Sequence, residues 1–453
     1  MDNNGYNNTA NQGNSYSYGY GGTPQGGYNM NDNKKKEGGF AKGVAVGIVC
    51  SLLAFCVIIL VNQFFKKDGN NISNNGGDFF SSLFGNNDDS SIFTDEQMSK
   101  INLIQQYIDI YSYYEQDNDK FIDGVYSALL QSLNDNYAVY YNEDAYTQIL
   151  EGNSGEYYGI GCVVTQNVQT GYVTVVQPYK NSPAYEAGIA VGDIILKADD
   201  IELTGMDLNE AVSYMKGGEG TEVTLTVIHE GKEKTVKVER RKIEVPTVEY
   251  EMLEDNVGYV QITGFEEVTE SQFSDAVDSL IADGAKGLVF DVRSNPGGSY
   301  DVVVAMLDKL LPEGTLVYTE DKYGNRQTET SDAACVELPM AVIINGDSAS
   351  ASEIFAGAMQ DYDAAEIIGT TSYGKGIVQS VIPMGDGTGI KFTIASYFTP
   401  KGVCIHGIGI EPDKKVELPS EDEAYDDNGY LKKEYDTQLD AAIKYINEQT
   451  NLH

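Results

Sequence analysis

One design occurs twice in the second half of the chain: an apolar strand leads through a tight turn of small residues into a helix. The first copy spans residues 287–310 and turns at 295–298, and the second spans 340–359 and turns at 345–352. In both copies a short apolar run is followed by an i, i+4 pattern. Because strands that alternate with helices pair in parallel, we expect an α/β layer with its functional residues where the strands end.

The turn of the second copy carries three serines, Ser348, Ser350 and Ser352, directly before the helix. Hydroxyl groups in such a turn lie beside the unpaired N–H groups of the first helical turn, which can stabilise the negative oxygen that forms when an acyl carbon is attacked. This arrangement suits a nucleophile, although serines before a helix also serve as caps and packing residues. The residues alone do not choose among the three.

A serine nucleophile needs a base within hydrogen-bond reach, and the chain offers few. Lys375 stands between two glycines ahead of an apolar run, and it acts as a base only if burial keeps it neutral. Gln379 follows four residues later, so on a continuous strand both side chains point to one face and Gln379 orients the lysine. A glycine-flanked lysine is also common as a solvated loop residue. His406 is the only histidine near these motifs. A Ser-His-Asp triad with His406 as the base is therefore an alternative to the lysine.

Charge and cysteine content disfavour several other functions. The net charge is −39, with 69 acidic and 30 basic residues, so phosphate would be repelled and nucleic-acid binding is disfavoured. The five cysteines form neither a disulfide framework nor a CxxC metal pattern. His229-Glu230 lacks a second histidine four positions on, so a zincin site is not supported. No metal or organic cofactor is expected.

The first 93 residues predict a tail, a membrane anchor and a linker. Residues 1–37 are rich in Asn, Gly and Tyr and are expected to be a disordered cytoplasmic tail. Residues 44–61 are 18 uncharged, mostly apolar residues, close to the roughly 20 that cross a bilayer, so 38–67 is predicted to be a retained transmembrane signal anchor; a cleaved signal peptide is the alternative. Four lysines precede the span and two follow it, which predicts a cytoplasmic N-terminus and an extracytoplasmic catalytic region. Residues 68–93 are a flexible linker.

Helical patterns precede a region of short strands. Residues 94–152 predict three helices, the first beginning at a capping box over 94–97. Residues 153–245 predict strands, among them 172–176 and 191–196, with a helix over 207–215. Residues 246–420 contain the two strand-turn-helix units, and 421–453 are expected to be an acidic loop and a closing helix.

Several strings in this order resemble a known family. The stretch SPAYEAGIAVGDIIL (182–196) resembles a PDZ domain, and SASASEI, AGAMQD, YGKGIVQ and GIGIEPD (between 348 and 413) resemble the C-terminal processing peptidases, or tail-specific proteases, which are serine peptidases with a Ser-Lys pair. The resemblance implies Ser350 as nucleophile, Lys375 as base and Gln379 as the supporting residue. It also implies an oxyanion hole formed by the N–H of Gly297 or Gly298 and that of Ala351.

The resemblance also implies how substrates are bound. In a PDZ domain a peptide adds as an edge strand while loop N–H groups cradle its terminal carboxylate, and Gly159, Ile160 and Gly161 match that loop. Lys216, after the 207–215 helix, is a candidate contact for a substrate carboxylate or the catalytic core, or alternatively a cap for the helix dipole. In the family the helical region often supports dimers, so a homodimer is implied.

Together these features predict a mixed α/β and α+β multidomain protein: a transmembrane helix, a helical segment, a PDZ-like β domain and a crotonase-like α/β peptidase core. The expected function is a membrane-anchored, extracytoplasmic serine endopeptidase that binds protein C-termini and cleaves through an acyl-enzyme. A non-catalytic PDZ scaffold and a crotonase-like acyl-transfer enzyme are the alternatives. Tyr373 replaces the usual Phe of the family, and residues 134–136 replace a commoner Asp-Pro pair; neither departure is expected to touch the dyad.

Overall fold

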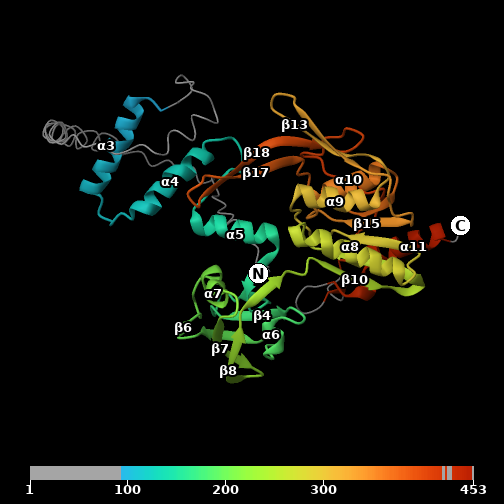
Figure 1. Cartoon of the computed structure of the whole chain (residues 1–453), viewed down its shortest axis with the longest axis horizontal. Helices are drawn as coiled ribbons and strands as arrows, with labels where there is room; N and C mark the ends of the chain where they lie inside the picture. Colours follow the sequence, from blue (N-terminus) through green and yellow to red (C-terminus); the bar gives the residue numbers. More distant parts are fainter. Residues whose placement is uncertain (1–92, 421–423, 426–430, 451–453) are drawn as a thin grey trace, which may run out of the picture. The chain divides into compact units, whose positions relative to one another are not determined.

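The computed structural model describes residues 93–420, 424–425 and 431–450 (Figure 1). The predicted tail, the anchor and nearly all of the linker lie outside the described residues. Among the described residues, no helix is long and apolar enough to cross a membrane. The chain divides into two compact units between residues 118 and 119, so helix α3 (Asp95–Tyr111) belongs to one unit and the chain from 119 onwards to the other.

Helix α3 begins where the sequence predicts. The Thr94 hydroxyl accepts a hydrogen bond from the N–H of Gln97 at 3.3 Å, and the Gln97 side chain accepts one from the N–H of Thr94 at 2.6 Å. These reciprocal bonds satisfy two N–H groups that a helix start would otherwise leave unpaired.

The centre of the larger unit is a six-stranded sheet in the order β10-β11-β12-β15-β16-β19. All neighbouring pairs are parallel except β10 with β11. The strands are β10 (Val248–Met252), β11 (Val257–Ile262), β12 (Gly287–Asp291), β15 (Met340–Ile344), β16 (Ala365–Gly369) and β19 (Lys414–Lys415). The two turns of the repeated design follow the adjacent parallel strands β12 and β15. They therefore lie close together at the carboxyl ends of these strands, as predicted.

Each face of this sheet has its own hydrophobic core. Along β15, Met340, Val342 and Ile344 pack with three helices, whereas Ala341 and Ile343 pack with the C-terminal helix. This alternation follows from the two-residue period of a strand. The three helices are α8 (Glu267–Ala282), α9 (Tyr300–Leu310) and α10 (Ala351–Asp361), the C-terminal helix is α11 (Thr437–Thr450), and two 3₁₀ turns are η1 (Glu254–Asn256) and η3 (Lys433–Tyr435). The core is therefore an α/β layer, as the sequence predicts.

A second sheet is built around the long strand β18. Strand β17 pairs with one edge of β18, and β1 and β13 share the other edge, with β14 beyond β13. The strands are β1 (Val139–Tyr141), β13 (Gly314–Asp321), β14 (Arg326–Ser331), β17 (Ile377–Pro383) and β18 (Gly389–Phe398). Strand β1 lies between helices α4 (Asn118–Gln131) and α5 (Glu143–Ser154). The region predicted to be helical therefore contributes a strand to a sheet of the peptidase core.

The PDZ-like region has a separate core and a sheet in the order β3-β4-β5-β7-β8, with β6 beside β5 and a β2·β9 ladder. Its strands are β2 (Glu156–Gly159), β3 (Cys162–Gln166), β4 (Val173–Pro178), β5 (Ile194–Ala198), β6 (Ile201–Glu202), β7 (Glu222–His229), β8 (Lys232–Glu239) and β9 (Arg241–Glu244), and its helices are α6 (Pro183–Glu186) and α7 (Leu208–Met215). Strand β5 begins three residues later than the predicted 191–196 because Gly192, at φ 85°, forms a turn.

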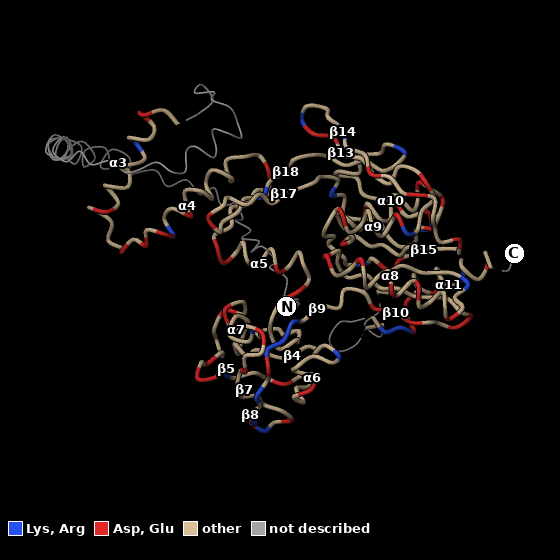
Figure 2. The backbone as a smooth tube through the Cα atoms, in the orientation of Figure 1, with Lys and Arg blue, Asp and Glu red and all other residues tan. Residues whose placement is uncertain are grey.

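Basic residues are concentrated along β8 and β9 of an otherwise acidic chain, where the backbone tube is coloured blue (Figure 2). Several of them are paired with carboxylates: Lys237 with Glu222 at 3.5 Å, and Lys242 with Glu156 at 2.8 Å. These ion pairs offset the local positive charge, so the two strands give no support for a phosphate-binding surface.

Candidate active site

The structure distinguishes the three serines of the turn before α10. The Ser348 hydroxyl is buried and donates to the Val292 carbonyl at 2.7 Å, and the buried Ser352 hydroxyl donates to the Asn295 carbonyl at 2.9 Å. Ser350 is half-buried; its side chain accepts from the Glu353 N–H in a capping box, and its hydroxyl donates to no described residue. Two serines therefore hold the turn together, and only the middle one has a hydroxyl free to react.

Ser350 has an unusual backbone conformation, with φ 56° and ψ −115°. A non-glycine residue in such a region stores about 1–3 kcal/mol of strain and persists only when its surroundings impose it. The Tyr397 hydroxyl donates to the Ser350 carbonyl at 3.1 Å, and the Ser350 N–H donates to Glu353 at 2.9 Å. These contacts hold the serine on a sharp strand-to-helix turn, the geometry that presents a nucleophile above a sheet.

Glu353 connects this turn to the segment that carries the lysine. Its side chain is completely buried, and one carboxylate oxygen accepts from the N–H groups of Ser350 and Lys375, at 2.9 and 2.8 Å. The other oxygen accepts from the Ser372 hydroxyl at 2.5 Å and from the Gly374 N–H at 2.7 Å. The backbones of the predicted nucleophile and base are thus fixed to one carboxylate.

Lys375 is half-buried in an environment that opposes its positive charge. Burial lowers the pKa of Lys375, the nearby charge of Lys391 lowers it further, and Glu353 acts in the opposite direction. The ammonium nitrogen lies over the ring of Tyr137, 4.6 Å from its centre. No hydrogen bond joins Lys375 to Ser350 in the part of the chain that the structure describes.

Gln379 does not share a continuous strand with Lys375, so that premise of the sequence analysis was wrong. Strand β17 begins after Lys375, and the register of β17 against β18 shifts between Val378 and Gln379. The Gln379 amide nitrogen lies 3.4 Å from the Ile377 carbonyl oxygen and 3.5 Å from the Thr393 hydroxyl, both long contacts. No hydrogen bond joins it to Lys375 among the described side chains.

His406 is exposed, and no hydrogen bond of its ring to another described residue is found. Its backbone packs against Gly376, where a Cβ would lie 2.5 Å from the His406 nitrogen. The glycine after the predicted base is therefore required for this close approach. The histidine has no contact that would orient it as the base of a triad.

The oxyanion candidates lie next to the serine. A Cβ on Gly297, which has φ 102°, would come within 2.8 Å of the Ser350 Cβ and 2.9 Å of the Ala351 nitrogen. The N–H of Gly297 already donates to the Asn295 side chain at 2.8 Å. The N–H groups of Gly298 and Ala351 have no partner among the described residues. Gly298 and Ala351 are thus the donors left to bind an oxyanion.

The segment 134–137 reaches the lysine through Tyr137, the residue directly after the departure at 134–136. Asp135 accepts hydrogen bonds from the N–H of Thr393 at 2.7 Å and from that of Tyr137 at 2.9 Å, which places the Tyr137 ring under Lys375. Tyr373 lies close enough to Tyr137 to raise the pKa of its phenol. Both departures therefore lie next to Tyr137, the residue that contacts Lys375.

A cavity of about 470 Å³ opens beside this segment. It is lined by residues 133–137 together with Ile377, Phe392, Thr393 and His406. Leu133, Ile377 and Phe392 provide apolar surface, and Ile377 lies only two residues after Lys375. The cavity offers room for a substrate side chain next to the base. Within the described residues, no group of His, Cys, Asp or Glu side chains is arranged to hold a metal ion.

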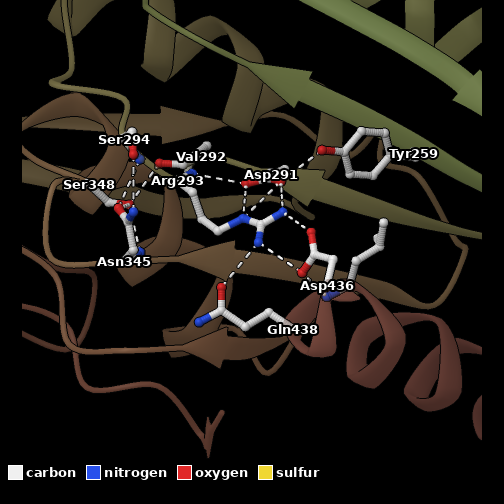
Figure 3. A network of polar contacts seen from close by, with 10 residues as sticks. Tyr259, Asp291, Val292, Arg293, Ser294, Asn345, Ser348, Asp436 and Gln438 are labelled. Atoms are coloured by element: carbon white, nitrogen blue, oxygen red, sulfur yellow. Dashed lines mark hydrogen bonds and ion pairs between the residues drawn. The ribbon is translucent and has the colours of Figure 1, made fainter. Parts of the chain in front are cut away.

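A network of ion pairs and hydrogen bonds lies next to the serine turn, where β12 and β15 end (Figure 3). Arg293, at the end of β12, binds buried Asp291 and pairs with Asp436, just before α11, at 2.7 Å. Beyond Arg293, the Asn345 side chain accepts from the Ser294 N–H at 2.8 Å, and the N–H of Asn345 donates to the Ser348 hydroxyl at 3.0 Å. The network links the C-terminal helix to the ends of β12 and β15, where the two turns begin.

The predicted peptide-binding loop precedes an open sheet edge. Strand β3 pairs only with β4 among the described strands, so its other edge can accept an added strand. The N–H groups of Ile160 and Gly161, directly before β3, have no partner among the described residues. Gly161 has φ 76°, and a Cβ there would clash with Ser182. Two unpaired N–H groups at the end of an edge strand suit a terminal carboxylate.

Gly159, the first residue of the predicted loop, lies close to Lys216. A Cβ on Gly159 would be 3.6 Å from the Lys216 Cα. The Lys216 ammonium forms a salt bridge with Glu151 of α5 at 2.6 Å and lies 5.1 Å from the centre of the Tyr157 ring. The lysine therefore connects the end of α7 to α5.

Sequence reasoning did not single out Asn295, Glu353 or Tyr137. Asn295 is fully buried; its side chain bonds the Gly297 N–H and the Ile262 carbonyl, and its own carbonyl accepts from Ser352. Glu353 follows Ser350 by three residues, the spacing of a capping box, so a local signal existed. Tyr137 has no such signal, because its contact with the lysine depends on distant pairing.

Two segments of the chain match known protein families. Residues 256–416 match peptidase family S41 and residues 174–228 match the PDZ domain. The carboxy-terminal processing protease CtpA of Bacillus subtilis is 36% identical over 328 residues, covering 72% of this chain and 70% of that protein. The carboxy-terminal-processing protease of Bartonella bacilliformis is 39% identical over 324 residues, 68% and 73% of the two chains.

Among solved structures, the photosystem II D1 C-terminal processing protease aligns with a TM-score of 0.43 and 27% identity, over 72% of this chain and 89% of that one. The chain therefore belongs to the carboxy-terminal processing proteases of peptidase family S41, which are serine peptidases, and it carries a PDZ domain.

Proposed function

We propose that this protein is a membrane-anchored, extracytoplasmic endopeptidase that captures protein C-termini with its PDZ domain and cleaves by a Ser350–Lys375 dyad. The observation that supports the dyad is the contrast within the turn: the buried Ser348 and Ser352 hydroxyls donate to backbone carbonyls, whereas Ser350 is strained and its hydroxyl donates to no described residue. The backbone of Lys375 is fixed to the same carboxylate as that of Ser350.

In the first half of the reaction the neutral Lys375 amine takes the proton of the Ser350 hydroxyl while the oxygen attacks the scissile carbonyl carbon. The carbonyl oxygen becomes an oxyanion and receives hydrogen bonds from the N–H groups of Gly298 and Ala351. Collapse of this intermediate breaks the C–N bond, and the lysine returns its proton to the leaving amine. The lowered pKa of Lys375 favours the neutral amine that the first step needs.

In the second half, water replaces the leaving peptide. The neutral lysine takes a proton from the water, the hydroxyl attacks the acyl-enzyme, and the Ser350 oxygen leaves with the proton that the lysine holds. Gln379, which the family pattern makes the supporting residue, is proposed to orient the amine during these transfers.

The PDZ domain is proposed to present the substrate. A peptide that adds to the free edge of β3 would place its terminal carboxylate at the unpaired N–H groups of Ile160 and Gly161. Gly159 allows the loop to approach Lys216, whose salt bridge with Glu151 would have to open before Lys216 could meet a substrate carboxylate.

Membrane anchoring and self-association complete the proposal. The uncharged run 44–61 with its lysine-rich flank supports a single span with the catalytic region outside the cytoplasm. Helices α3 and α4 each contain no fully buried residue and expose apolar side chains, such as Ile104 on α3 and Ile122 on α4. Such surfaces favour a homodimer; sedimentation of an Ile122→Glu variant should show more monomer than the parent chain.

The central test uses the full chain in detergent with an unfolded protein that ends in an apolar C-terminus. Wild type should cleave it, Ser350→Ala and Lys375→Ala should not, and a charged C-terminus should slow cleavage. Ser271→Ala, which changes an exposed serine in α8, is the control and should cleave normally. Binding of the tail without cleavage by wild type would favour the non-catalytic scaffold, and full activity of Lys375→Ala would refute the dyad.

A further inference from the structure

We propose that Tyr137 is a positioning residue for the base: the face of its ring holds the Lys375 ammonium group in place and stabilises its charged form between turnovers. The inference rests on the proposed Ser-Lys dyad. The contact is direct, because the lysine nitrogen lies 4.6 Å from the centre of the ring. At this distance the negative face of an aromatic ring attracts a cation.

Hydrogen bonds to strand β18 fix the backbone segment that carries the Tyr137 ring. Asp135 accepts from the Thr393 N–H at 2.7 Å, from the Thr393 hydroxyl at 3.1 Å and from the Tyr137 N–H at 2.9 Å. Burial alone would raise the pKa of Asp135, but these hydrogen bonds lower it, so the carboxylate stays charged and keeps its donors. Two residues after Tyr137, strand β1 begins and pairs with β18. The backbone that carries the ring is therefore fixed on both sides of Tyr137.

The phenol itself stays neutral. Burial raises the pKa of Tyr137, and the neighbouring Tyr373, Asp135 and Glu353 raise it further. The lysine therefore meets an aromatic face rather than a phenolate, and the contact depends on the ring and not on an ion pair. Phenylalanine at this position should support the lysine as tyrosine does.

Neighbouring groups shift the protonation equilibrium of Lys375 in opposite directions. Burial and the charge of Lys391 on β18 favour the neutral amine, whereas Glu353 on α10 and the ring of Tyr137 favour the ammonium form. His406 packs against the next residue through its backbone, while its side chain is exposed. Removing the face of the ring should shift this balance toward the neutral amine and also leave the amine less well placed.

The experiment measures how fast a fluorophosphonate probe acylates Ser350 of the full chain in detergent across a pH series. This readout needs neither the PDZ domain nor a natural substrate. For Tyr137→Leu the acid limb of the profile should move to lower pH by roughly 0.5–1 unit, because the ammonium form loses its cation–π contact. The plateau at high pH should fall by roughly ten- to a hundredfold, because the amine is no longer held in place. Tyr137→Phe should keep both the limb and the plateau.

A matched control tests whether the loss of any lysine-contacting ring has the same effect, and a second variant covers the case that Tyr137→Leu does not fold. In Tyr323→Leu the lost ring lies under another lysine, Lys322 at 5.0 Å, and the profile should not change. If Tyr137→Leu does not fold, pentafluorophenylalanine at position 137 keeps the ring shape but removes its negative face, so the acid limb should move to lower pH as well.

Each outcome separates this inference from the proposed function. An unchanged limb in Tyr137→Leu or in the fluorinated variant overturns the positioning role while leaving the dyad intact. A Phe variant that behaves like Leu assigns the effect to the hydroxyl group and also overturns it. Acylation that persists in Lys375→Ala at the wild-type rate refutes the dyad itself.

Discussion

Glu353→Gln is the most informative single change in the site, because four donors converge on one fully buried carboxylate. One oxygen accepts from the N–H groups of Ser350 and Lys375, and the other accepts from the Ser372 hydroxyl and the Gly374 N–H. A glutamine keeps one oxygen and replaces the other with an NH₂ group, which donates and cannot accept. The variant must therefore leave some donors unpaired.

The two orientations of the amide differ in cost. With its oxygen toward Ser350 and Lys375, the NH₂ group faces the Ser372 hydroxyl, which can reverse its role, and the Gly374 N–H, which cannot. One buried N–H then loses its acceptor, at a cost of about 1–3 kcal/mol. The opposite orientation leaves two N–H groups unpaired, at about 2–6 kcal/mol. The first orientation should prevail, so Glu353→Gln should lose about 1–3 kcal/mol of stability and keep measurable activity.

Glu353→Ala removes all acceptors and should behave differently. Three buried N–H groups lose their partner, so the loss should be at least about 3 kcal/mol, and Ser350 acylation should become undetectable. Urea unfolding followed by probe labelling measures both effects, with Glu270→Gln, an exposed glutamate on α8, as the control. If Glu353→Ala matched wild type in midpoint and labelling rate, the carboxylate would not be what holds the nucleophile and the base together.

Three further changes test other parts of the site. Gly297→Ala should lower the cleavage rate by about 10²–10³, because the new Cβ would press on the serine turn and displace an oxyanion donor; normal rates would exclude this loop from the site. Lys391→Met should move the acid limb of activity to higher pH, because the charge of Lys391 lowers the pKa of Lys375 and its loss lets that pKa rise. Asp436→Asn should cost about 1.5–3 kcal/mol in urea unfolding, because its charged bonds to Arg293 are lost, while Asp440→Asn on exposed α11 surface should cost little.

Local patterns predicted the elements whose stability is local. The capping box at Thr94 and the apolar run of β15 both appear where the sequence indicates them. Strands β13 and β14 and strand β16 were not predicted. Strand β14 alternates Arg, Gln, Thr and Glu with almost no burial, so it carries no apolar period, and its identity comes from pairing with β13.

Strand β1 shows the same limit more sharply. It has three residues, too few for a period to be recognised, and its partner in β18 lies about 250 positions later in the chain. The bond between Asp135 and Thr393 spans 258 positions. No pattern within either segment encodes this contact, which is why the sequence could not reveal that Tyr137 reaches the lysine.

For a related reason, the sequence alone could not identify the candidate nucleophile among the three serines. Ser348, Ser350 and Ser352 are equivalent in composition and spacing, and they differ only in what the rest of the fold offers them. The carbonyls of Val292 and Asn295, both from the other strand-turn-helix unit, bind the outer two. Adjacent parallel strands thus leave Ser350 as the candidate nucleophile by satisfying its neighbours, and the repeated design matters because one copy supports the other.

Lys375 is held at both ends of its side chain, and this determines what activation requires. Its backbone N–H is bound to Glu353, and its ammonium group lies on the ring of Tyr137. Because Glu353 also binds the Ser350 N–H, the backbones of base and nucleophile are already placed relative to each other. Under the proposed dyad, the neutral amine has to reach the Ser350 hydroxyl by rotation about side-chain bonds that the ring of Tyr137 restricts. A cleavage step limited by this rotation should respond to changes at Tyr137 far more than to changes in the remote elements that merely stabilise the fold.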